Sequence, residues 1–391
     1  MTQHDVSFAS QIDWSAFRAE MPVVKRWLYL DHAAVAPLPA SARDAISDWA
    51  NEAASDGDTA WPRWKAAVDR LRGKAAALIG AAPEEVAIIK NTTEGINIIA
   101  LGYPWQKGDN VVLPADEFPT NQYPWIQLAS QGVEVRRIEP GCPGRLYDAI
   151  REACDGHTRI ITISWVNYAT GFRVDLDRLA ELARDVGALL FVDAIQGLGV
   201  FPLDVRQIPI DFLAADGHKW LLGPEGAGLF FCRHNHLERL RPVGIGWNSV
   251  VHASDYSRIE LNLKPSVARY EGGSYNMVGV IGLEASLSLL QSFGVQRLAS
   301  RILEVTDWAC ELLRQHGARI HSERDGEHRS GIVSFEFPGV DPALARRRCL
   351  EHGVVLSSRG GRLRISPHAY NTEEDIERLI EALTLIRKQG G

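Results

Sequence analysis

A lysine and an aspartate occupy positions that suit imine chemistry. Lys219 directly follows His218 and lies between the apolar stretch 212–215 and a glycine-rich turn. A lysine held against apolar side chains has a lowered pKa, which leaves its amine free to attack a carbonyl carbon. Asp193 lies 26 residues upstream, at the end of the most apolar stretch, 188–193. A carboxylate at that point would either cap a helix or pair with a buried cation.

A pair of hydroxyl side chains marks a second position of interest. Residues 89–97 are predicted to run from a strand into a helix that opens with Thr92 and Thr93. The free N–H groups and the positive dipole end of a helix attract anions, and a phosphate suits such a place. Threonines at a helix start also serve simply as caps, so this signal acquires meaning only beside the lysine and the aspartate.

Alternating strands and helices would position these residues. Short runs rich in Val, Ile and Phe predict strands over residues 86–90, 110–114, 133–138, 159–166, 188–193, 212–215 and 228–232. Because these runs are apolar on successive residues, they suit strands covered on both faces. Residues 175–187 show a helical apolar stripe that Gly187 closes. This rhythm predicts a large α/β domain with a mostly parallel sheet, whose strand ends bind ligands.

The pattern changes near residue 282. Helices are predicted over 283–293 and 296–316, strands over 331–337, 353–357 and 362–366, and a last helix begins near Thr372 with a capping box. We therefore expect an N-terminal arm over residues 1–30 that packs on the small domain, a large cofactor-binding domain over 31–281, and a small α+β domain over 282–391.

Composition narrows the class of protein. The 391 residues carry 42 Lys and Arg against 49 Asp and Glu, a net charge of −7, with no block of like charges that would favour nucleic acid. Hydrophobic residues make up 46%, yet no apolar run approaches the roughly 18 residues of a membrane span. The five cysteines are scattered and never form CxxC, so neither a disulfide framework nor a metal site is expected. These features predict a cytoplasmic protein.

Taken together, the aspartate, the His-Lys pair and the Thr-Thr pair are typical of one enzyme family. The chain resembles pyridoxal 5'-phosphate (PLP) enzymes of the class V aminotransferase family, in the branch of cysteine desulfurases, selenocysteine lyases and isopenicillin N epimerase. The resemblance extends from residues 28–34 to residues 364–372. It implies the fold type I architecture of PLP-dependent transferases, PLP as cofactor and an α-amino acid as substrate.

The resemblance also implies roles for single residues around the cofactor. Lys219 would hold PLP as a Schiff base, and Asp193 would pair with the pyridinium nitrogen. Other residues would contact the ring or the phosphate: Gln196 and Asn167 near the phenolic oxygen, Phe118 stacked on the ring, and Thr92, Thr93 and His218 at the phosphate. Ser274 matches a hydroxyl lent to the phosphate of a neighbouring subunit, which implies a homodimer with shared sites. Asp216 departs from the family pattern, because many desulfurases have serine there.

At the substrate end, Arg364 resembles the residue that clamps the substrate carboxylate. A guanidinium suits this task because its fork forms two parallel hydrogen bonds with a carboxylate. His32 and Asn167 would line the same pocket, whereas Arg359, Arg362 and His368 receive no role.

The reaction type stays open at this stage. Lys219 would remove the Cα proton as general base, which serves an aminotransferase, a C–S or β-elimination lyase, and an epimerase or racemase equally. A PLP-binding protein without catalysis is a further alternative. A persulfide-forming desulfurase is not expected, because residues 357–363 contain no cysteine and Cys349 falls in a helical pattern.

Overall fold

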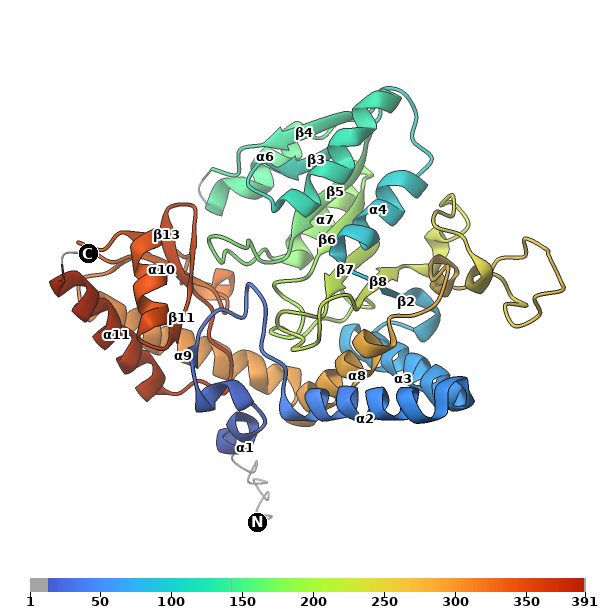
Figure 1. Ribbon diagram of the computed structural model, residues 1–391. Coiled ribbons are helices and arrows are strands. Elements are labelled where there is room, and N and C mark those ends of the chain that lie inside the picture. Colours follow the sequence, from blue (N-terminus) through green and yellow to red (C-terminus); the bar gives the residue numbers. More distant parts are fainter. Residues whose placement is uncertain (1–12, 142, 390–391) are drawn as a thin grey trace, which may run out of the picture.

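The computed structural model describes residues 13–141 and 143–389. Its largest element is a seven-stranded sheet in the order β2-β8-β7-β6-β5-β3-β4 (Figure 1). Its strands are β2 (Val86–Ile89), β3 (Asn110–Pro114), β4 (Glu134–Ile138), β5 (Thr158–Ser164), β6 (Leu189–Asp193), β7 (Phe212–Asp216) and β8 (Gly228–Cys232). Every adjacent pair is parallel except the two that β8 makes, with β7 and β2. The predicted α/β class, with a mostly parallel sheet, is confirmed.

Both faces of this sheet are covered, as the unbroken apolar runs predict. On β6, Leu190 and Val192 belong to one core cluster and Phe191 to another, because successive strand side chains point to opposite faces. The cluster around Phe191 includes residues of α4 (Thr92–Gly102) and α5 (Tyr123–Ile126). The opposite cluster includes residues of α3 (Trp61–Ile79), α6 (Leu146–Ala153), α7 (Leu176–Val186) and α8 (Met277–Phe293). α2 (Ala40–Asp56) packs on α8.

A second, antiparallel sheet forms the smaller part of the molecule. It has the order β12-β13-β10-β9, with β9 (Arg319–Ile320), β10 (Val333–Glu336), β12 (Ser357–Arg359) and β13 (Arg362–Ile365). Three helices, α9 (Val295–Gln315), α10 (Pro342–Glu351) and α11 (Glu373–Lys388), complete its core. The predicted single strand over 353–357 is wrong. Its first half is β11 (Val354–Val355), which pairs with β1 (Leu28–Tyr29), and its last residue begins β12.

The N-terminal segment lies beside this smaller part. In α1 (Trp14–Ala19), Arg18 forms an ion pair of 2.8 Å with Asp375 of α11. Residues 1–12 of the expected arm lie outside the described residues, and the domain boundaries at residues 30 and 281 stay predictions. Within the described ranges no single helix is both long and apolar enough to cross a bilayer. α8 and α9 meet the two criteria only as a pair, which is bent by 81° at the junction.

Candidate active site

A cavity of about 300 Å³ opens at the carboxyl ends of β6 and β7. The start of α4 and the hairpin β12–β13 form its other walls. Eight residues singled out from the sequence line this cavity: Thr92, Thr93, Phe118, Asp193, Gln196, His218, Lys219 and Arg364. The sheet therefore brings together side chains that are up to 272 positions apart along the chain.

Lys219 lies just beyond β7 and is almost completely buried. Its Nζ atom is 5.7 Å from the centre of the Phe118 ring, and among the described residues it has no hydrogen-bond or ion-pair partner. Burial lowers its pKa to about 8. The chain turns at Leu222 with a φ of 56°, a left-handed conformation that a leucine rarely adopts. A buried amine with a lowered pKa is the group that imine formation needs.

Asp193 is the last residue of β6 and is buried as well. Its carboxylate accepts a hydrogen bond of 3.1 Å from the backbone N–H of Ile195. Burial raises the pKa of Asp193 to about 6, although the nearby Lys219 acts in the opposite direction. A buried carboxylate with so few donors stabilises a cation brought into the cavity, such as a protonated ring nitrogen.

The N-terminus of α4 forms the anion-binding end of the cavity. Asn91 caps this helix by accepting a hydrogen bond of 3.0 Å from Glu94 N–H. Thr92 Oγ1 accepts from the backbone N–H of Asp216, and Thr93 Oγ1 lies 3.1 Å from Thr120 Oγ1. The Asp216 carboxylate accepts from Gly217 N–H at 2.7 Å and lies 3.0 Å from His218 Nδ1. Asp216, which stands where many desulfurases have serine, therefore has carboxylate contacts within its own segment, residues 216–218.

Arg364 forms the opposite end and is fully buried. Its guanidinium donates to Asp31 Oδ1 at 3.0 Å, to Ser357 Oγ at 3.0 Å and to the backbone oxygen of Tyr168 at 2.6 Å. Arg359 lines the same cavity, donates to Ser358 O at 2.8 Å, and makes no ion pair within the described part of the chain. Two guanidinium groups therefore converge here, and Asp31 neutralises only one of them.

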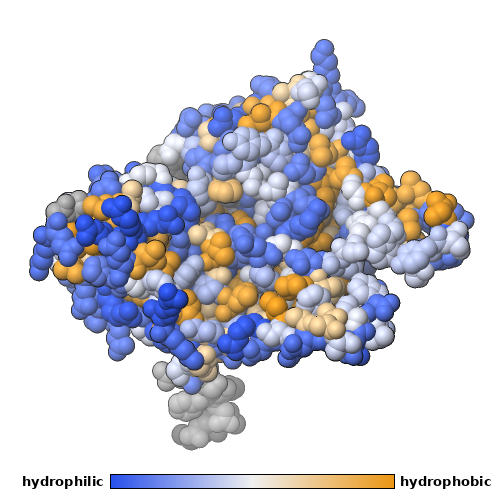
Figure 2. Space-filling model, in the orientation of Figure 1, coloured by the Kyte–Doolittle hydropathy of each residue, from blue (hydrophilic) through white to orange (hydrophobic). Residues whose placement is uncertain are grey.

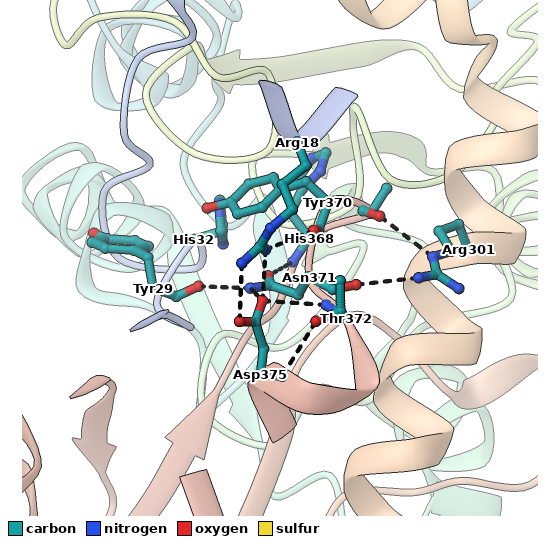
Figure 3. Close-up of polar contacts among 10 residues, drawn as sticks. Arg18, Tyr29, His32, Arg301, His368, Tyr370, Asn371, Thr372 and Asp375 are labelled. Atoms are coloured by element: carbon teal, nitrogen blue, oxygen red, sulfur yellow. Dashed lines mark hydrogen bonds and ion pairs between the residues drawn. The ribbon is translucent and has the colours of Figure 1, made fainter. Parts of the chain in front are cut away.

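Three predicted site residues lie elsewhere. His32 is completely buried in a cluster with His368 and Tyr370 (Figure 3) and is not among the residues that line the cavity, so its place in the pocket wall stays a prediction. Asn167 lines a neighbouring cavity of about 430 Å³ and donates to Asp116 Oδ2 at 3.0 Å. Ser274 lines a third cavity of about 480 Å³ beside the protruding loop. None of the three is among the residues that line the Lys219 cavity, and their roles stay predictions.

Sequence reasoning assigned no role to Asp31 or to Glu117. Asp31 pairs with Arg364, and only its position between apolar residues 28–30 and His32 pointed to burial. Glu117 accepts from the backbone N–H and the hydroxyl of Ser164 and from Asn121, and burial raises its pKa to about 8. Its partners belong to other segments, so no local pattern reveals them.

These groups fit PLP. The cavity offers a buried amine for the aldehyde, a buried carboxylate for the ring nitrogen, and a helix N-terminus for the phosphate. Phe118, 42% exposed, lines the cavity above the lysine. The donor set therefore agrees with the cofactor that the resemblance implies.

Comparisons with known proteins agree with this arrangement. The family model described as aminotransferase class-V matches residues 28–379. A probable cysteine desulfurase of Methanothermobacter thermautotrophicus is 33% identical, over 95% of this chain and 98% of its own. The solved structure of the cysteine desulfurase CsdA of Escherichia coli, 26% identical, superposes with a TM-score of 0.87 over 97% of this chain and 100% of its own. The cystine C–S lyase C-DES, 22% identical, shares the fold with a TM-score of 0.86 over 93% and 98%.

Proposed function

The chain belongs to the class V aminotransferase family of PLP-dependent enzymes, and from this premise we propose that it cleaves the C–S bond of a cysteine-derived α-amino acid by β-elimination. The relatives support the chemical class, because a curated relative is named a probable cysteine desulfurase and a protein of the same fold is named a cystine C–S lyase. The observation that carries the choice between these two reactions is the hairpin at the substrate end of the cavity.

The shortness of this hairpin supports the proposal that no loop with a nucleophilic cysteine reaches the cavity. Arg359 of β12 pairs with Arg362 of β13. Gly360 and Gly361 alone connect them, with φ angles of 55° and 73°. Positive φ at both positions is the geometry of a tight two-residue turn, which Gly-Gly favours. Residues 357–365 contain no cysteine, which supports β-elimination over persulfide formation.

The described cysteines do not replace it. Cys154, Cys232, Cys310 and Cys349 all lie outside the cavity wall, and burial raises the pKa of each thiol. Cys349, the nearest in sequence, is buried in the core of α10, α11 and the small sheet. A nucleophilic thiol needs a lowered pKa and access to the substrate. Cys142 lies outside the described residues.

The charged residues of the cavity have separate roles in the proposed reaction. Arg359 and Arg364 bind the substrate carboxylate, and Lys219 Nζ takes up the Cα proton once it is a free amine. When bound, PLP supplies the electron sink that makes this proton acidic. The electron pair of the Cα–H bond then forms a Cα–Cβ double bond while the Cβ–S pair leaves with sulfur. Water hydrolyses the three-carbon remainder to pyruvate and ammonia, so the step needs no oxidant.

The test is a product analysis of the PLP-loaded protein with L-cystine, S-methyl-L-cysteine and L-cysteine, each with and without 2-oxoglutarate. We expect pyruvate and ammonia in a 1:1 ratio without the keto acid. Products that form only with 2-oxoglutarate would make the protein an aminotransferase. Stoichiometric alanine from L-cysteine, lost in Cys349→Ser, would make it a desulfurase. Either result overturns the proposal.

We also propose that the enzyme works as a homodimer. The loop between β8 and α8 projects from the body of the molecule, and Figure 2 shows apolar side chains on it. Six large hydrophobic residues of this loop are exposed: Ile245, Trp247, Val251, Tyr256, Ile259 and Leu261. Contiguous exposed apolar surface of this kind marks a protein interface. Ser274 lies at its base, in position to serve a neighbouring site.

A further inference from the structure

A buried aromatic cluster lies directly behind the lysine. Trp220, the next residue after Lys219, is 1% exposed and is not among the residues that line the cavity. Its ring lies 6.1 Å from the His32 ring at 27° and 5.9 Å from the His368 ring at 30°. Tyr370 closes the cluster, 5.3 Å from His32 and 6.0 Å from His368. Figure 3 shows His32, His368 and Tyr370 gathered in this way.

One hydrogen bond connects this cluster to the cavity. Trp220 Nε1 donates to Gln196 Oε1 at 2.8 Å, and Gln196 Nε2 donates to the backbone oxygen of Ala33 at 3.0 Å. An indole can only donate and a carbonyl can only accept, so the opposite orientation of the amide would place donor against donor and acceptor against acceptor. The two partners therefore fix the Gln196 amide. One N–H of its Nε2 remains, on a side chain that lines the cavity.

The cluster is built to hold the indole still. His32 Nδ1 bonds to Ser366 O at 2.9 Å and its Nε2 lies 3.0 Å from Tyr370 OH, so the ring cannot turn without losing both contacts. A Cβ atom on Gly331 would lie 2.5 Å from the Trp220 ring, which makes glycine necessary there. Burial lowers the pKa of His32 to about 4, so the ring that stacks on Trp220 is uncharged at neutral pH.

We propose that Trp220 is a positioning residue, which fixes the Gln196 amide so that its remaining N–H donates to the phenolic oxygen of PLP. The inference rests on the proposed cofactor placement and not on the reaction type. An N–H donor stabilises the ionised oxygen and weakens its hold on the proton that it shares with the Lys219-derived nitrogen. The resulting prediction concerns the bound cofactor itself, before any substrate is added.

The test is the pH titration of the visible absorption band of bound PLP. Trp220→Phe keeps the ring and removes the donor, and we expect the midpoint to rise by about half a unit to one unit. Gln196→Ala should raise it at least as far, and the double variant should add nothing, because Trp220 acts through Gln196. Trp105→Phe is the control, since its Nε1 donates to Ala100 O at 2.7 Å away from the cavity. Its midpoint should equal that of the wild type.

Gly331→Ala is a second variant, should Trp220→Phe fold poorly. Its methyl group would displace the indole and move its N–H away from Gln196 without removing the donor chemically, and the midpoint should again rise. Unchanged midpoints in Trp220→Phe or Gly331→Ala, or additive shifts in the double variant, would overturn the role of Trp220. A wild-type enzyme that releases no pyruvate while these shifts persist would instead overturn β-elimination alone.

Discussion

The two walls of the cavity differ in how their charged side chains are paired. We call the wall with Asp193 and Lys219 the sheet wall and the wall with Arg364 the hairpin wall. On the sheet wall, the Asp193 carboxylate has one backbone donor, and Lys219 Nζ has no hydrogen-bond or ion-pair partner in the described ranges. On the hairpin wall, Arg364 has three acceptors, one of them the Asp31 carboxylate. Burial displaces the pKa values of Asp193 and Lys219 toward neutral forms. The charged groups of the sheet wall therefore have few partners until the cofactor binds, whereas Arg364 on the hairpin wall is already paired within the protein.

The largest effect should come from the sheet wall. Lys219→Ala removes the only amine among the described residues that line the cavity, and we expect pyruvate release to fall by about 10³-fold or more, since general base catalysis alone contributes 10²–10⁴. PLP should still bind, but borohydride should no longer fix it covalently to the chain. Lys90→Ala is the matched control, because Lys90 is exposed and pairs with Glu94 at 3.2 Å. Activity within tenfold of the wild type would contradict the role of Lys219.

On the hairpin wall, the largest effect should be on stability. Arg364→Gln leaves the buried Asp31 carboxylate without its cation, and breaking a buried ion pair costs roughly 3–5 kcal/mol. Urea unfolding of the cofactor-free protein measures this loss. Arg362→Gln is the control on the same hairpin, because Arg362 is partly exposed and lies 3.6 Å from Glu336, and it should change stability by less than about 1 kcal/mol. Equal losses of unfolding free energy in the two variants would contradict the proposal that the Arg364–Asp31 pair stabilises the hairpin wall.

This contrast also explains what the sequence reveals. The strand 110–114 was predicted at its observed bounds, and the strands ending at Asp193 and near Lys219 to within one residue, because apolar runs are local. Lys219 and Asp193 were found for the same reason. Strand order in the sheet depends on pairs up to 145 positions apart, such as Val86 with Phe231, and Asp31 pairs with Arg364 across 333 positions. Local sequence patterns do not reveal such contacts, which is why the stacking of His32 on Trp220 was not predicted.

Asp193 gives a prediction with a defined sign. Its pKa of about 6 in the folded state lies above the unfolded value of 3.8, so burying the charge destabilises the cofactor-free protein as pH rises through that interval. Asp193→Asn should therefore be more stable than the wild type by about 2–3 kcal/mol at pH 8 and equal to it near pH 3. Urea unfolding at the two pH values is the measurement. PLP affinity should move in the opposite direction, because the ring cation loses its partner.

The lowered pKa of Lys219 sets the pH dependence of cofactor capture. Only the neutral amine attacks the aldehyde, and with a pKa of about 8 its fraction rises about fivefold from pH 7 to 8 and less than twofold from pH 8 to 9. Rapid mixing of cofactor-free protein with PLP measures the rate. A tenfold rise over each of these units would indicate an ordinary, solvated lysine, and the sheet wall would then lack its desolvated amine.

Ser274 should show the smallest effect, because one hydroxyl among several phosphate contacts contributes little. We expect Ser274→Ala to weaken PLP binding by about threefold to tenfold, the value of one hydrogen bond. Ser274 lines the cavity beside the projecting loop and not the Lys219 cavity of its own chain. The hydroxyl would therefore complete the site of the partner subunit, so that residues of both subunits would form the phosphate end of each cavity.

Mixed dimers decide whose site Ser274 serves. When chains with Lys219→Ala assemble with chains with Ser274→Ala, only the second kind supplies a working lysine. If Ser274 acts across the interface, that lysine faces an intact serine from the first kind of chain, and its site binds PLP with wild-type affinity. If Ser274 acts within its own chain, the same site lacks the hydroxyl and binds PLP as weakly as the Ser274→Ala homodimer. Titration of the visible absorption band with PLP distinguishes these two affinities. Weak binding in the mixed dimer, or a fully active monomer by light scattering, would contradict the proposal that Ser274 serves the partner subunit.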